Sequence, residues 1–185
     1  MKGSDSMSSI DVRRVTRTAI LIALTVAFQS LGLQQMVTGP VVNMFLYLAV
    51  MVVGMWSGVV TGLVTPAVAL WVGILKPAMA PMVPAIALAN AALAVVFGLV
   101  SGIGGRRSVA FRIIAVLIAS LTKFLILSTT VKYLVQVPGP LAKMMQGTQL
   151  VTALVGGALA LVLVEILSRT GIVGDMAGKA GQKRS

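Results

Sequence analysis

The chain has 185 residues, of which 58% are hydrophobic and 10% are charged, and it contains neither cysteine nor histidine. Soluble domains carry about 25% charged residues, so this composition predicts one integral membrane domain. The missing residue types exclude disulfides and the usual zinc and haem ligands. The formal net charge of +11 does not indicate nucleic-acid binding, because most basic residues flank apolar segments, where they set membrane topology.

Apolar segments follow one another along the chain without the alternation of a membrane β-barrel, so we expect an all-α bundle of six transmembrane helices. The expected helices lie at residues 18–33, 41–55, 59–75, 82–100, 109–134 and 148–167. Together they form a membrane domain at 17–168, between a polar cytoplasmic lead-in at 1–16 and a basic cytoplasmic tail at 169–185.

Glycine and proline residues mark the links between these helices. Gly39-Pro40 is expected to interrupt helical structure and start a turn after the first helix. Gly54 with Ser57-Gly58 predicts a tight turn after the second helix. The third and fourth helices are joined by a short link that contains Lys76, Pro77, Pro81 and Pro84. We expect these two helices to form a hairpin with a stiff turn at the membrane surface, as one wall of a small-molecule site.

The distribution of basic residues predicts the topology. An even number of helices places both termini on one side of the membrane, and most basic residues fall on that side. The opposite side holds only Lys76, Lys132 and Lys143. This bias predicts cytoplasmic termini. Glu165 and Arg169 are one helical turn apart and are predicted to pair at the membrane edge.

Polar side chains gather in the half of the predicted bundle that lies opposite the termini, among them Gln29 and Thr148. A concave apolar site with a few convergent polar groups is what a small ligand needs. The alternative is that these residues mark the membrane interface or join helices. The residues predicted to bind substrate are Gln34, Gln35, Thr38, Asn43, Trp71, Lys76, Asn90, Lys123, Gln146 and Gln149.

Lys123 is the most informative single residue, because it lies roughly 15 Å from the end of its helix, near the membrane midplane. A lysine there costs about 2.5–3.5 kcal/mol on insertion scales, and the sequence offers no acid within the membrane to neutralise it. Its side chain is expected to snorkel, to contact carbonyl groups, or to meet a carboxylate or phosphate on a ligand. The acid-free half around it favours an anionic or electron-rich substrate.

The chain lacks the motifs of an enzyme. It has no P-loop, no paired carboxylates, no nucleophile with a histidine base and no metal cluster. We therefore expect no catalytic residues, no metal site and no cofactor. Ala19, Ala23 and Ala27 are spaced four apart in the first helix, which favours close approach of another helix, either of a partner or within the bundle.

The sequence resembles the substrate-binding S-components of energy-coupling factor (ECF) vitamin transporters over essentially its whole length. The resemblance rests on six helices in a short chain, a basic lead-in to the alanine-spaced first helix, and two segments. These segments are TGPVVNMFLYLAVMVVGMWSGVVTGLVTP, from Thr38, and QLVTALVGGALAL, from Gln149.

The resemblance implies a vitamin or cofactor precursor bound under the links at 34–40, 76–84 and 136–147. It also implies a membrane T-component and two ATPase subunits as partners, with Ala19 and Ala23 matching the T-component contact, in the plasma membrane of a prokaryote. Members that carry nickel or cobalt use an amino-terminal histidine, which is missing here. Two alternatives remain, a self-contained secondary transporter or exporter, and a membrane scaffold protein.

Overall fold

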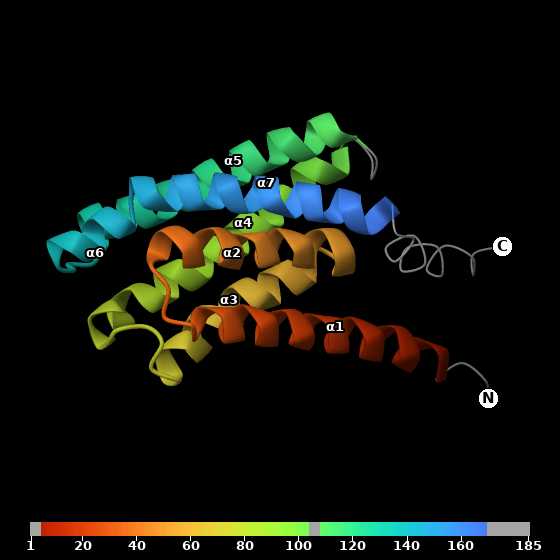
Figure 1. The fold of residues 1–185 in the computed structure, drawn as a ribbon, viewed down its shortest axis with the longest axis horizontal. Helices are drawn as coiled ribbons and strands as arrows, with labels where there is room; N and C mark the ends of the chain where they lie inside the picture. Colours follow the sequence, from red (N-terminus) through yellow and green to blue (C-terminus); the bar gives the residue numbers. More distant parts are fainter. Residues whose placement is uncertain (1–4, 104–107, 170–185) are drawn as a thin grey trace.

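The computed structural model describes residues 5–103 and 108–169, and every regular element in this part of the chain is a helix. Six long helices and four short helical segments follow one another (Figure 1). In chain order they are α1 (Asp5–Gln29), α2 (Gln35–Leu48), the π-helix η1 (Ala49–Val53), α3 (Met55–Trp71), the 3-10 helix η2 (Pro77–Met82), α4 (Val83–Ile103), α5 (Val109–Thr129), the π-helix η3 (Thr130–Leu134), α6 (Gly139–Met144) and α7 (Gly147–Arg169).

Four continuous helical segments of the described chain are long and apolar enough to cross a membrane. They are Gln35–Val53, Pro77–Ile103, Val109–Leu134 and Gly139–Arg169, with mean hydropathies of 2.0 to 2.5. The chain is therefore an all-helical, multi-pass membrane protein, as its composition predicts. The 17-residue α3 is apolar but shorter, and α1 carries three arginines in its first half, so these two helices fall outside this set.

The helices run roughly along one axis, so the molecule has two ends (Figure 1). The start of α1, the facing ends of α4 and α5, and the end of α7 lie at one end, which we call the arginine end after Arg13, Arg14, Arg17 and Arg169. The other end carries η2 and α6 with Lys76, Lys132 and Lys143, and we call it the lysine end. The predicted pair of Glu165 and Arg169 is confirmed, with 3.1 Å between Oε1 and Nε.

The main hydrophobic core lies in the half of the bundle toward the arginine end, where α2, α4, α5 and α7 pack together. The ring of Tyr47 meets that of Phe97 edge to face, with centroids 4.9 Å apart, and its hydroxyl lies 2.9 Å from Ser120 Oγ. Gly156 allows α7 to touch the backbone of α2, since a Cβ there would lie 2.7 Å from Asn43 Cβ. This half is closely packed.

Two predicted breaks turn out to be packing positions inside helices. Gly39 and Pro40 lie within α2, where a Cβ on Gly39 would come 2.8 Å from Thr152 Cγ2 of α7. Ser57 and Gly58 lie within α3, and Gly58 faces Val50 too closely for any side chain. These residues are buried, so their small size serves close helix contact rather than a turn.

Other boundaries differ by smaller amounts. The turn predicted at Gly54 is confirmed, since its φ of 136° suits glycine alone. The first helix begins at Asp5 rather than near residue 18, because no glycine or proline interrupts residues 5–29. The link expected at 136–147 contains the short helix α6.

Candidate ligand-binding site

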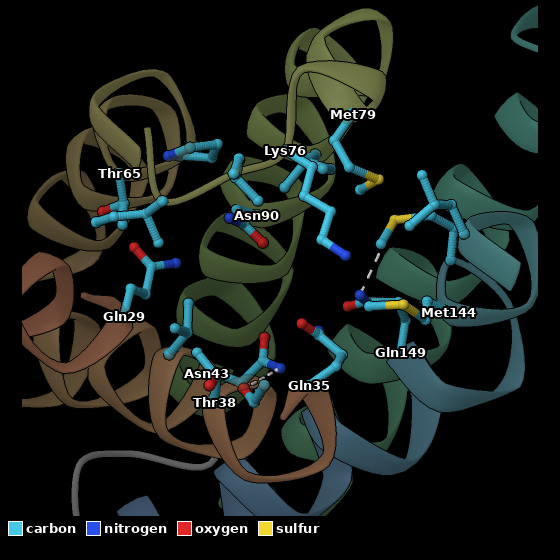
Figure 2. Close-up of a pocket in the computed structure, with 18 of the residues that line it drawn as sticks. Gln29, Gln35, Thr38, Asn43, Thr65, Lys76, Met79, Asn90, Met144 and Gln149 are labelled. Carbon is cyan, nitrogen blue, oxygen red and sulfur yellow. Dashed lines mark hydrogen bonds between the residues drawn. The ribbon is translucent and has the colours of Figure 1, made fainter. Parts of the chain in front are cut away.

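A cavity of about 300 Å³ opens in the lysine-end half, where the ends of six helices and two short segments meet. Its apolar wall comes mainly from leucine, isoleucine and methionine, including Ile74, Leu75 and Ile86. Figure 2 shows polar side chains converging on this space from α1, α2, α3, α4 and α7. The polar lining residues are Gln29, Gln35, Thr38, Asn43, Thr65, Lys76, Asn90, Lys123 and Gln149.

Seven of the ten residues predicted to bind substrate line this cavity: Gln35, Thr38, Asn43, Lys76, Asn90, Lys123 and Gln149. On α2, Gln35, Thr38 and Asn43 fall within about 140° of the helix circumference, since each residue turns about 100° around the axis. That face points inward because its neighbours Gly39 and Pro40 are buried against α7.

The other three predicted residues do not line the cavity. Gln34 and Gln146 are exposed, and Trp71 is 87% exposed at the last turn of α3. Their exposed positions favour the alternative interpretation, in which polar and aromatic residues mark the membrane interface.

Lys123 lies buried in the bundle, only 3% exposed, so it does not snorkel. Its Nζ donates a hydrogen bond to Asn43 Oδ1 at 2.7 Å, and Asn43 Nδ2 donates to the Gly39 carbonyl at 2.9 Å. Within the described chain no carboxylate forms a salt bridge with Lys123. An ammonium group has three N–H donors, so the bond to Asn43 leaves two for a molecule in the cavity.

Asn90 presents an unused acceptor to the same cavity. Its Nδ2 donates to the Gly62 carbonyl of α3 at 3.4 Å, which fixes the amide so that Oδ1 faces away from α3. This oxygen is buried and has no hydrogen-bond partner, and Figure 2 shows it directed into the cavity. A buried acceptor without a donor costs about 1–3 kcal/mol, so a ligand that donates to Asn90 recovers that cost.

The cover of the cavity is built from the two links at the lysine end. Met79 and Met82 of η2 pack with Leu127 and Met145 in a second hydrophobic cluster. Lys76 precedes η2, and Figure 2 shows its ammonium extending into the cavity from this cover. Unbranched methionine side chains repack easily, so the packing of this cover can adjust.

Several lining residues were not predicted from the sequence. Thr65 precedes a proline within α3, and Met79, Met144 and Met145 come from η2 and the region of α6. The three methionines could have been predicted as lining residues, because they fall within the two links expected to cover the site. Thr65 could not, since a threonine in an apolar helix usually bonds its own backbone, as it does here to the Thr61 carbonyl at 2.6 Å.

Ala19, Ala23 and Ala27 lie on the exposed side of α1. Beside Ala19 is a second hollow, of about 460 Å³, between α1 and the start of α3. Next to it Thr18 Oγ1 and Ser57 Oγ lie 2.8 Å apart and join the two helices. The alanines are therefore not used for packing inside the bundle and remain accessible to another helix.

The described residues contain no group of three or more acidic, histidine or cysteine side chains that would hold a metal ion. Comparison with protein-family models gives no match, and neither the curated proteins nor the solved structures give a significant one.

Proposed function

We propose that this protein is the substrate-capture subunit of an ECF-type transporter that imports a vitamin or cofactor precursor. The observation that carries the proposal is the cavity under η2 and α6, lined by five amides and two lysines in an otherwise apolar bundle. Buried polar groups are costly in a membrane protein unless they serve a ligand or pathway. In this proposal the lysine end faces outward and receives the substrate.

The remaining parts of the proposal concern topology and partners. All six long helices cross the plasma membrane of a prokaryote, and both termini are cytoplasmic, as the excess of arginine at that end favours. The exposed alanines of α1 provide the contact with a T-component. Energy comes from two ATPase subunits on other chains, because this sequence contains no P-loop of its own.

Two other functions are less well supported. A self-contained secondary transporter or exporter needs a site for a coupling ion, usually built with acidic residues within the membrane. The carboxylate of Glu165 is exposed and paired with Arg169, so it does not supply one. A membrane scaffold protein has no need for a polar cavity, and substitutions at Lys123 or Asn90 would leave its function intact.

The test is affinity purification of the tagged chain from the cells that encode it, followed by native mass spectrometry. We expect a bound small molecule on the isolated chain, and co-purification of a T-component with two ATPase subunits when membranes are extracted gently. Ala19→Leu and Ala23→Leu should reduce co-purification of those subunits but keep the small molecule. Ala158→Leu, at an exposed alanine of α7, is the matched control.

The proposal fails if the folded chain releases no small molecule and never co-purifies with such subunits. Uptake by proteoliposomes that contain this chain alone, driven by an ion gradient, would favour the secondary transporter instead.

A further inference from the structure

We infer that the cavity selects a small molecule that carries an oxyanion, a carboxylate or phosphate, together with an N–H or O–H donor. This inference rests on the proposed function, since it names the chemical class of the captured substrate. It follows from the arrangement of charge, donors and acceptors around the cavity.

The first argument is charge. Lys76 and Lys123 are the ionisable residues among those that line the described cavity, and no carboxylate lines it. Lys123 is buried, and its one described side-chain partner, Asn43, is neutral. An ammonium held in an apolar bundle without a counter-ion is costly, so an anionic ligand gains attraction there that a neutral ligand does not.

The second argument is preorganisation. Asn43 is fixed by its bond to the Gly39 carbonyl, and it holds the Lys123 ammonium in turn. Gln149 of α7 also lines the cavity, and its Nε2 has only a weak contact of 4.0 Å with Met145 Sδ. The Lys123 ammonium is positioned before the ligand arrives, which lowers the cost of binding an oxyanion.

The third argument is an unused acceptor in the same cavity. Asn90 Oδ1 is buried and unpartnered, and it faces the cavity from α4. An anion alone would leave this oxygen unsatisfied, so the complete match is a ligand that carries both an oxyanion and a donor.

Size and wall chemistry narrow the class further. About 300 Å³ is the lower end of the range for ligand pockets, which supports a small molecule. No aromatic side chain among the described residues lines the cavity, so stacking on a flat ring contributes nothing to recognition there. Methionine and leucine side chains instead contact the body of the molecule.

The experiment identifies the small molecule released from the purified chain in mild detergent, and then measures its occupancy in variants. Lys123→Met and Lys76→Met should each lower the occupancy at least about 10-fold, because each removes a charge that contacts the oxyanion. Lys132→Met and Lys143→Met are the controls, since both lysines are exposed at the same end and neither lines the cavity. Helicity and gel-filtration profiles establish that each variant is folded, and Lys76→Met, on an exposed residue, retains the test if Lys123→Met does not fold.

A second measurement uses the identified molecule in two forms, as the free acid or phosphate and as its uncharged amide or dephosphorylated form. The uncharged form should bind at least about 10-fold more weakly to the original chain, and the difference should shrink in Lys76→Met. A carboxylate and a phosphate are distinguished by mass.

Three results would overturn the inference but leave the proposed function standing: a neutral or cationic molecule, a folded Lys123→Met or Lys76→Met chain with full occupancy, or equal binding of the two forms. Release of a phospholipid alone would overturn the inference by assigning the cavity to membrane lipid. Absence of any bound molecule would overturn the inference, and it would overturn the proposed function as well if no T-component and no ATPase subunits co-purify.

Discussion

Two buried polar side chains, one toward each end of the bundle, differ in their hydrogen bonding. Toward the arginine end, Tyr47 is fully buried, but its hydroxyl has Ser120 as a partner and its ring packs on Phe97. Toward the lysine end, Asn90 is equally buried and its carbonyl oxygen has no partner. A fully satisfied polar group stabilises one packed arrangement, whereas an unsatisfied one facing a cavity indicates a place for a ligand. The predictions below test this division, from the largest expected effect to the smallest.

Gly156→Val should give the largest loss of stability, at the contact between α7 and α2. Any Cβ at this position lies 2.9 Å or less from Asn43 Cβ and Met44 N on α2, so α7 must move away from α2. We expect the free energy of unfolding to fall by at least about 3 kcal/mol, measured by SDS or thermal unfolding in detergent.

Gly102→Ala is the control for that substitution, because nothing lies within 4 Å of a Cβ added there near the end of α4. It should be neutral or slightly stabilising. Equal effects of the two substitutions would show that α2 and α7 are not in close contact.

Asn43→Leu should cost about 2 kcal/mol of unfolding free energy, because it leaves the buried Lys123 ammonium without its hydrogen-bond acceptor. In the double variant with Lys123→Met the ammonium is gone, and most of the loss should be recovered. The measurement is a double-mutant cycle on unfolding midpoints. Strictly additive effects would show that the two side chains do not interact in the membrane.

Tyr47→Phe should cost about 1 kcal/mol, since it removes the hydrogen bond with Ser120 but keeps the ring contact with Phe97. Ligand occupancy should not change, because Tyr47 does not line the cavity. A loss of ligand without a loss of stability would contradict the division between the halves.

Asn90→Leu should give the smallest change in stability, within about 0.5 kcal/mol, because it exchanges one weak bond of 3.4 Å for the removal of an unsatisfied oxygen. Occupancy by the small molecule should nevertheless fall. Thermal unfolding of the ligand-free chain, combined with native mass spectrometry, separates the two effects. A clear loss of stability with full occupancy would assign Asn90 to packing.

The sequence by itself determined the class of protein and most of the helix positions. Long apolar segments exclude a soluble fold, and the fifth helical segment runs from Val109 to Leu134 as expected. The absence of intramembrane acids and the position of Lys123 also marked the right region of the bundle. The sequence also placed Gln35, Thr38 and Asn43 at the same end of the bundle, around the link expected after the first helix, but it did not predict that all three belong to one helix.

The tertiary structure decided what depends on the approach of distant segments. Gly39-Pro40 reads locally as a break, but α7 packs against it and keeps it helical, with Thr152 next to Gly39. In the same way Lys123 donates a hydrogen bond to Asn43, which is 80 residues away in sequence. Trp71 and Thr65 lie on the same helix, yet only Thr65 reaches the cavity. Propensity and periodicity are properties of neighbouring residues, whereas the partner of a buried polar group is set by which helices meet, and that is fixed only when the bundle packs.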